Sequence, residues 1–317
     1  MRLVILDGHT LYGSAEACKD LEVFGEVVYY PRSAPGEVAE RLRDADVALT
    51  NKVPISKEAI AASPKLRYIG VTATGYNMID LEAARAAKIT LTNVPGYSTD
   101  SAAQTVIALL LEITNQTGHH AARVAEGAWV KCPDFSFADF PLPELAGQTM
   151  GIVGFGEIGQ AVGRIANAFG MKVIYNTRTK KSFDQYPVRY VDMAELFREA
   201  DVVTLHCPLT PENKGFIAWP LLQTMKRSSI LINTARGLLL NEADVARALK
   251  ENVIAWAGLD VLSAEPPPAD NPLLSAPHCF ILPHLAWSGV SARKRLKSEI
   301  ITNLRGFIDG QPRNVIR

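Results

Sequence analysis

Three glycines, at positions 154, 156 and 159, stand where a short apolar segment at 150–153 gives way to a helical one at 160–169. Glycine accounts for 22 of 317 residues, so the spacing alone is a weak signal, but a second apolar segment at 172–175 strengthens it. The first glycine permits a tight turn, the second lets the backbone approach a phosphate, and the third lets helix and strand pack closely. The pattern predicts a loop that holds a dinucleotide pyrophosphate at a helix N-terminus, formed by Gly154, Phe155, Gly156, Glu157, Ile158 and Gly159. A βα turn without a ligand is the alternative.

Short apolar segments alternate with helical stretches along the whole chain, which predicts βαβ units and parallel sheets. A length of 317 residues corresponds to about two domains, and 48% hydrophobic residues suffice for two cores. The expected strands fall into two series. The first comprises 3–6, 27–30, 47–49, 68–71 and 89–91, and the second comprises 150–153, 172–175, 202–205, 230–232, 255–259 and 280–282. We therefore expect an α/β protein with two doubly wound parallel-sheet domains.

The region between the two series contains the longest helical pattern, at 102–126, which is too long for a crossover in the small first sheet. The loop that follows, 127–143, is rich in aromatic residues. We expect this loop to pack against the other domain or a second subunit, or to cover the chain's own core. The last helix, expected at 290–307, can fold back onto the first domain.

Charge and cysteine content exclude several classes of protein. Lys+Arg and Asp+Glu number 33 each, so the long-range field that recruits nucleic acid is absent. No apolar run approaches the ~20 residues that span a bilayer, and the N-terminus does not resemble a signal peptide. The four cysteines are scattered, as in reducing compartments. We expect a cytoplasmic protein that binds neither nucleic acid nor membrane, and no metal site, since the adjacent His119 and His120 diverge on a helix.

The segment after the expected strand 172–175 bears on the choice of dinucleotide. NAD sites usually place Asp or Glu there to accept from the ribose 2′-hydroxyl. This chain instead has an amide, two hydroxyls and three cations, in the order Asn176, Thr177, Arg178, Thr179, Lys180 and Lys181. Because a 2′-phosphate would be held by cations, the sequence favours NADP(H). A solvated basic turn with Asn176 on an NAD ribose is the alternative.

Three residues at strand ends of the second series suit hydride transfer to a carbonyl. Arg236 follows the strand near 230–232, Glu265 follows that near 255–259, and His284 follows that near 280–282. Open α/β sheets bind ligands at these ends. Each residue alone has an ordinary structural explanation, and their joint position beside a dinucleotide loop supports a catalytic role.

The chain resembles the D-isomer-specific 2-hydroxyacid dehydrogenases over nearly its full length. The matching motifs, in the family's order, are 74–80 (TGYNMID), 92–96 (TNVPG), the Gly154 loop, 206–210 (HCPLT), 233–237 (NTARG), Asp260 with Glu265-Pro266, and Pro283-His284. Within the family, the segments 97–101, 131–135 and 140–142, with Trp287, look most like glycerate dehydrogenases, also called hydroxypyruvate reductases. Gln104 departs from the Glu of many relatives at a position expected to be structural.

The resemblance implies a role for each matching residue. His284 would donate a proton to the 2-oxo oxygen, and Glu265 would orient His284 and raise its pKa. Arg236 would bridge the substrate carboxylate and carbonyl oxygen. Backbone N–H groups of Ala73, Thr74 and Gly75 would hold the same carboxylate. Asp260 would accept from the nicotinamide carboxamide, and the dinucleotide would also be lined by Thr234, Ala235, Arg236, His284, His206, Cys207 and Pro208.

The resemblance also implies an organisation and a reaction. A Rossmann cofactor domain, 100–287, would be inserted in a flavodoxin-like substrate domain made of 1–99 and 288–317. The helix at 102–126 would serve a homodimer interface. The expected reaction is NAD(P)H-dependent reduction of hydroxypyruvate to D-glycerate, with glyoxylate as a further substrate. A dinucleotide-sensing binding protein of the co-repressor type, which belongs to the same fold family, is the alternative.

Overall fold

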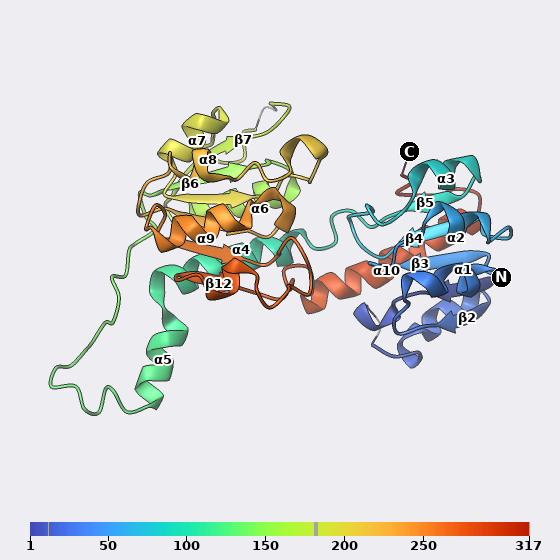
Figure 1. Cartoon of the computed structure of the whole chain (residues 1–317), viewed down its shortest axis with the longest axis horizontal. Coiled ribbons are helices and arrows are strands. Elements are labelled where there is room, and N and C mark those ends of the chain that lie inside the picture. The colour runs from blue at the N-terminus through green and yellow to red at the C-terminus, as the bar shows by residue number, and fades with distance from the viewer. Residues whose placement is uncertain (12, 181–182, 317) are drawn as a thin grey trace. The chain divides into compact units, whose positions relative to one another are not determined.

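The structure, a computed structural model, describes residues 1–11, 13–180 and 183–316 (Figure 1). The chain divides into two compact units. The first contains Met1–Ser98 and Gly289–Arg317, and the second contains Thr99–Ser288. Each unit has its own parallel sheet, which confirms the α/β fold class.

The sheet of the first unit has the order β2-β1-β3-β4-β5, which is the flavodoxin-like order. Its strands are β1 (Arg2–Ile5), β2 (Glu26–Tyr29), β3 (Val47–Thr50), β4 (Tyr68–Val71) and β5 (Thr90–Thr92). The central strands β3 and β4 are buried along their whole length, as their uninterrupted apolar character requires in a sheet covered on both faces. Three short helices follow strands of this sheet: α1 (Val38–Leu42), α2 (Lys57–Ala61) and α3 (Leu81–Ala86).

The end of the chain belongs to this first unit. Helix α10 (Val290–Ile308) packs on β4 through the rings of Phe307 and Tyr68, whose centroids are 4.9 Å apart. The Asn303 side-chain amide donates to the Asn93 carbonyl at 2.9 Å, and Ile316 N–H donates to the Leu91 carbonyl at 2.8 Å. These contacts join segments more than 200 residues apart.

The sheet of the second unit has the order β12-β11-β10-β9-β6-β7-β8. Counted from β6, the first six strands have the Rossmann order 3-2-1-4-5-6, and β12 adds a seventh. The strands are β6 (Thr149–Val153), β7 (Lys172–Asn176), β8 (Arg189–Tyr190), β9 (Val202–Leu205), β10 (Ile230–Asn233), β11 (Trp256–Leu259) and β12 (Cys279–Ile281). The short β8 was not expected. The helices are α4 (Thr99–Asn115), α5 (Thr117–Ala125), α6 (Glu157–Ala168), α7 (Met193–Glu199), α8 (Trp219–Leu222) and α9 (Glu242–Lys250).

The prediction of one long helix at 102–126 is wrong, because the structure has two helices there. Gln116 lies between α4 and α5 in the left-handed region, with a φ of 50°. The Glu112 carboxylate accepts from the Thr117 hydroxyl at 2.9 Å and from Gly118 N–H at 3.2 Å, and so satisfies donors at the start of α5. This carboxylate supplies the cap that the new helix needs.

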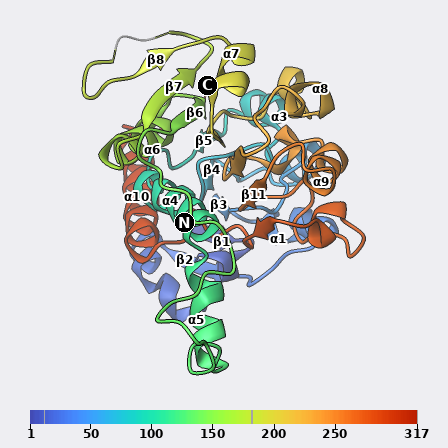
Figure 2. The ribbon, with the colours of Figure 1, turned by 90° about the vertical axis from the view of Figure 1, so that its left-hand side faces the viewer.

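Helix α5 and the loop after it extend away from the sheet of their unit (Figure 1, Figure 2). Part of the aromatic loop covers α5: the Phe140 ring lies 4.9 Å from that of His119, whose Nε2 is 2.7 Å from an Asp139 oxygen. Other residues of the loop face water, with Val130 and Phe135 each 91% exposed. Packing against α5 therefore buries only part of this loop, and the rest is exposed to solvent.

The four cysteines are free thiols. Within the described part of the chain, no helix combines the length and apolar character needed to cross a membrane.

Candidate active site

The three glycines form a tight junction between β6 and α6. Gly154 has a φ of 94°, and a Cβ added to it would lie 2.6 Å from the backbone of His206 and Cys207. A Cβ on Gly159 would lie 2.3 Å from the Gly154 carbonyl oxygen. A Cβ on Gly156, by contrast, would meet nothing within 4 Å. The first and third glycines are thus required by close packing, and the second faces open space.

That space is part of a cavity of about 700 Å³ at the carboxyl ends of β6, β7 and β9. Predicted residues that line it are Gly154, Phe155, Gly156, Asn176, Thr177, Arg178, Thr179, His206, Cys207 and Pro208. Residues not predicted also line it: Val153, Met193, Thr210, Glu212, Asn213 and Phe216. Thr210 ends the 206–210 motif but was not assigned to the cofactor, and the other five lie outside the motifs that the sequence analysis identified. The other predicted cofactor residues lie outside this lining: Glu157, Ile158, Gly159, Thr234, Ala235, Arg236, Asp260 and His284.

The residues present fit a dinucleotide. Helix α6 begins at Glu157, and no side chain caps its N-terminal N–H groups, which leaves donors for a pyrophosphate. The Thr234 hydroxyl oxygen is buried and has no hydrogen-bond partner among the described residues, so it is available to a ligand. Space, donors and a buried hydroxyl therefore all favour a bound phosphate-bearing group.

The end of β7 presents polar and basic groups to the cavity. The Asn176 side-chain amide donates to the Val191 carbonyl at 2.8 Å, an arrangement that leaves its oxygen for a ligand. Arg178 is exposed and makes no hydrogen bond or ion pair with any residue that the structure describes. Lys180 lies over the Tyr190 ring, 5.3 Å from its centroid, and Lys181 lies outside the described residues.

His206 is a neutral imidazole in the cavity lining. Its Nε2 is 2.9 Å from the Thr204 hydroxyl oxygen, and burial lowers the pKa of His206 to about 3. The residue therefore carries no charge at neutral pH, and it does not provide a titrating group for proton transfer there.

His284 and Glu265 form a close pair. His284 Nδ1 lies 2.6 Å from Glu265 Oε2, and the other Glu265 oxygen accepts from Leu262 N–H at 3.2 Å. Because Nδ1 faces the carboxylate, Nε2 is the ring nitrogen left to face a substrate. The predicted pair is thus assembled from two loops that are 19 residues apart in sequence.

Asp260 holds the loop that carries His284. Its carboxylate accepts from Leu285 N–H at 2.7 Å and from Ala286 N–H at 2.9 Å, while its backbone carbonyl accepts from His284 N–H at 2.9 Å. Burial raises the pKa of Asp260. The sequence analysis predicted only a contact between Asp260 and the nicotinamide. It did not predict that Asp260 positions the loop that carries His284.

Arg236 follows β10 on a turn fixed by a buried amide. The Asn233 side chain accepts from Ala235 N–H at 2.9 Å and donates to the Arg236 carbonyl at 2.8 Å, while the guanidinium donates to the Ala235 carbonyl at 2.7 Å. A Cβ on Gly237 would lie 1.9 Å from the Leu262 backbone, so this turn packs directly on the loop that leads to Glu265. The exposed Arg236 therefore lies on a backbone that is firmly placed.

In the first unit, Ala73, Thr74 and Gly75 form a turn just after β4. The Thr74 hydroxyl donates to the Val94 carbonyl at 2.8 Å, and the Asn93 side-chain amide donates to the Thr74 carbonyl at 2.7 Å. The backbone N–H groups of residues 73–75 donate to none of the residues that the structure describes. Three consecutive donors of this kind can receive a carboxylate.

The chain matches the family model described as "D-isomer specific 2-hydroxyacid dehydrogenase, NAD binding domain" over residues 107–286, which is more than half of its length. The chain belongs to the D-isomer-specific 2-hydroxyacid dehydrogenases. Members of this family are oxidoreductases, and this dehydrogenase transfers a hydride between a nicotinamide dinucleotide and a small 2-oxo or 2-hydroxy acid.

Individual relatives agree with the family match. A hydroxypyruvate reductase of Blautia hydrogenotrophica is 44% identical over 320 residues, covering 100% of this chain and 99% of the relative. A glycerate dehydrogenase of Methylorubrum extorquens is 38% identical over 285 residues, covering 89% of this chain and 88% of the relative. Among solved structures, an acyclic imino acid reductase in complex with NADPH and D-Arg has a TM-score of 0.90 at 30% identity, with complete coverage of both chains.

Proposed function

We propose that this dehydrogenase reduces hydroxypyruvate to D-glycerate and accepts glyoxylate as a second substrate. The observation that carries the proposal is the pair of His284 Nδ1 and Glu265 Oε2, 2.6 Å apart, at strand ends of the unit that contains the dinucleotide cavity. The 44% identical hydroxypyruvate reductase supports the choice of substrate. No observation favours a binding protein without turnover.

The reaction needs a proton for the carbonyl oxygen at the moment that a hydride reaches carbon 2. A bound nicotinamide dinucleotide supplies that hydride. In the proposal His284 donates the proton from Nε2, and Glu265 stabilises the protonated ring from the Nδ1 side. In the reverse direction, His284 takes the proton from the 2-hydroxyl group.

The substrate carboxylate requires donors in a fixed geometry. We assign this task to the N–H groups of Ala73, Thr74 and Gly75 and to Arg236, whose guanidinium also stabilises the charge that develops on the carbonyl oxygen. The support is that these three N–H groups have no partner among the described residues, and that the Arg236 turn is fixed by Asn233.

For the dinucleotide, we propose a preference for NADP(H) over NAD(H). The end of β7 carries Asn176 in place of a carboxylate, and Arg178 reaches the cavity without an ion-pair partner among the described residues. A 2′-phosphate gains a charge-assisted hydrogen bond from such an arginine. The structural relative in complex with NADPH supports this choice.

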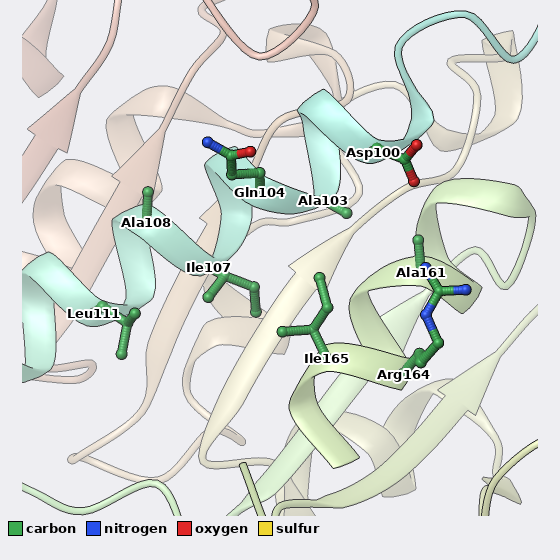
Figure 3. Close-up of a pocket in the computed structure, with 9 residues that line it drawn as sticks. All are labelled: Asp100, Ala103, Gln104, Ile107, Ala108, Leu111, Ala161, Arg164 and Ile165. Carbon is green, nitrogen blue, oxygen red and sulfur yellow. The ribbon is translucent and has the colours of Figure 1, made fainter. Parts of the chain in front are cut away.

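A homodimer is part of the proposal. A groove of about 400 Å³ runs between α4 and α6 (Figure 3). Ile107 and Ile165 point toward each other in it, and its rim carries one acid, Asp100, and one base, Arg164. An interface with two-fold symmetry brings such a patch against a copy of itself, where the acid of one chain can meet the base of the other. The four free thiols support a cytoplasmic location.

The first test is an initial-rate assay of the reduced cofactor's absorbance, with hydroxypyruvate, glyoxylate and pyruvate, each against NADH and NADPH. We expect the fastest oxidation with hydroxypyruvate and NADPH. Faster turnover with pyruvate overturns the substrate assignment, and a preference for NADH overturns the cofactor assignment. Tight cofactor binding without oxidation of any substrate would favour the sensing protein.

A further inference from the structure

A row of hydrogen-bonded amide side chains links the C-terminal segment of the first unit to the turn after β4. The Asn93 side-chain amide, just after β5, donates to the Thr74 carbonyl at 2.7 Å. The Asn303 amide, on α10, donates to the Asn93 carbonyl at 2.9 Å. The Asn314 amide donates to the Asn303 side-chain oxygen at 2.8 Å. Each amide therefore joins one segment to the next, and the last bond reaches the backbone of the turn.

Asn303 lies in the middle of this row and is only 1% exposed. Both ends of its side-chain amide are used, because the nitrogen donates to the Asn93 carbonyl and the oxygen accepts from Asn314. A buried polar group that loses a partner is not compensated by water. Removal of this amide therefore leaves the Asn93 carbonyl without the bond that holds it in place.

Asn314 is itself firmly anchored. Its side-chain amide also donates to the Glu299 carboxylate at 2.8 Å, and its backbone carbonyl accepts from Asn93 N–H at 3.3 Å. Its φ of 52° lies in the left-handed region, which Asn adopts more readily than most residues with a side chain. Close by in sequence, Ile316 N–H donates to the Leu91 carbonyl at 2.8 Å. The C-terminal segment is thus a fixed support beside the end of β5.

The turn at residues 73–75 is tied to the segment that this support holds. Besides the bond from Asn93, the Thr74 hydroxyl donates to the Val94 carbonyl at 2.8 Å, and Val94 N–H donates to the Ala73 carbonyl at 3.0 Å. These bonds use the carbonyl groups and the hydroxyl group of the turn, and leave its three N–H groups to a ligand. The direction of those N–H groups therefore depends on where residues 93 and 94 lie.

We propose that Asn303 and Asn314 are positioning residues for the substrate carboxylate, which act through Asn93 on the N–H groups of residues 73–75. This inference rests on the proposed function, which assigns the carboxylate to those N–H groups. A hydrogen bond weakens steeply as its angle departs from linear, so several donors bind one carboxylate well only in a fixed orientation. The carboxylate is present before and during hydride transfer, so the row of amides should affect the KM rather than the kcat.

The test measures steady-state kinetics with hydroxypyruvate and glyoxylate in Asn303→Ala and Asn314→Gly. Glycine adopts the left-handed region freely, so the second variant removes the amide and keeps the backbone conformation. We expect each variant to raise the KM for both 2-oxo acids by the same factor, about 3- to 10-fold, the range for one net hydrogen bond. The kcat and the dissociation constant of the reduced cofactor should stay within about twofold.

Thr302→Ala is the matched control. Thr302 precedes Asn303 on α10, and its hydroxyl donates to the Ser298 carbonyl of the same helix at 2.9 Å, so this variant should leave the KM unchanged. Asn303→Asp keeps an oxygen for Asn314 but cannot donate to the Asn93 carbonyl. It should raise the KM at least as much as Asn303→Ala.

An unchanged KM in Asn314→Gly would overturn the inference, and this variant decides the question if Asn303→Ala does not fold. A lower kcat with an unchanged KM would also overturn it. Unequal KM changes for hydroxypyruvate and glyoxylate would do the same, because the two substrates share the carboxylate. Failure of the proposed function is a different result, since the wild type would then not reduce hydroxypyruvate.

Discussion

Two acidic residues with different tasks place His284. Glu265 contacts the ring at Nδ1, whereas Asp260 accepts hydrogen bonds from the backbone N–H groups of His284 itself and of Leu285. Removal of the ring should therefore abolish proton transfer without moving the loop. We expect His284→Ala to lower kcat by about 10²-fold or more, while the dissociation constant of the reduced cofactor changes by less than about threefold.

Steady-state kinetics and a fluorescence titration of the cofactor measure the two quantities. His278→Ala is the matched control, because His278 is also a histidine in the left-handed region, with a φ of 56° against 54° for His284. It should leave kcat unchanged. Near-normal turnover in His284→Ala would show that His284 is not the proton donor.

Arg178 provides a separate test of cofactor choice. Arg178→Ala removes a guanidinium that lines the cavity, so it should weaken NADPH binding by about 1–3 kcal/mol and leave NADH nearly unaffected. Dissociation constants for both cofactors measure the difference, and Lys172→Ala, at the opposite end of the same strand, is the control. Equal losses for NADPH and NADH would contradict a contact with the 2′-phosphate.

His206 should make the stability of the protein depend on pH. The unfolded chain protonates this residue below about pH 6.5, whereas the folded protein protonates it only near its lowered pKa of about 3. Protons therefore bind preferentially to the unfolded state in that window, and the free energy of unfolding falls as the pH drops from about 6.5 toward 3.

Urea unfolding at about pH 7.5 and about pH 5 tests this, with His206→Gln as the variant, because an amide can still reach Thr204 but does not titrate. We expect a smaller loss of stability at the acidic pH in His206→Gln than in the wild type. The same loss in both proteins would show that His206 is not the group responsible.

At the scale of elements, hydrophobic patterning predicted most strands within one or two residues. Two features of the secondary structure were not predicted, the strand β8 and the break between α4 and α5, and each has a physical cause. The two-residue β8 is too short to show a pattern, and the break at Gln116 depends on the Glu112 carboxylate, which satisfies donors that a continuous helix would not expose. For the candidate site, the sequence predicted the glycine loop and the strand-end residues Arg236, Glu265 and His284. The sequence did not predict that the Asp7 carboxylate accepts from Asn51 N–H or that the Asp260 carboxylate accepts from Leu285 N–H. These partners lie 44 and 25 residues away along the chain, and no local motif marks them.

The junction of β6 and α6 can be tested through its third glycine. Gly159→Ala places a methyl group 2.3 Å from the Gly154 carbonyl oxygen, so the helix must move away from the strand. We expect a loss of unfolding free energy of about 1–3 kcal/mol and an affinity for the reduced cofactor that is lower by about tenfold or more. Urea unfolding and cofactor titration measure these effects. Gly36→Ala, where a Cβ would meet nothing within 4 Å, should be neutral, and a neutral Gly159→Ala would contradict the close approach.

At the scale of the whole molecule, the chain leaves the first unit after Ser98 and returns to it at Gly289. The return is held by hydrogen bonds to β5 and to Asn93, so the first unit is complete only after the second has been synthesised. The second unit has its own seven-stranded sheet and its own cores, and it carries the groove between α4 and α6. An interface at that groove would join two copies through a unit that is continuous in sequence.

Ala108 is the position at which this interface can be tested without harm to the fold, because it lines the groove but is exposed. A carboxylate there would be buried without a partner in a dimer, whereas in a monomer it would stay in water. We expect the wild type to have the mass of a dimer in sedimentation equilibrium at micromolar concentration, and Ala108→Glu to shift toward the monomer with unchanged urea unfolding of its secondary structure. Ala86→Glu, at an exposed alanine of α3 in the first unit, should remain dimeric. A dimer that persists in Ala108→Glu would place the interface elsewhere, and a monomeric wild type would remove the homodimer from the proposal.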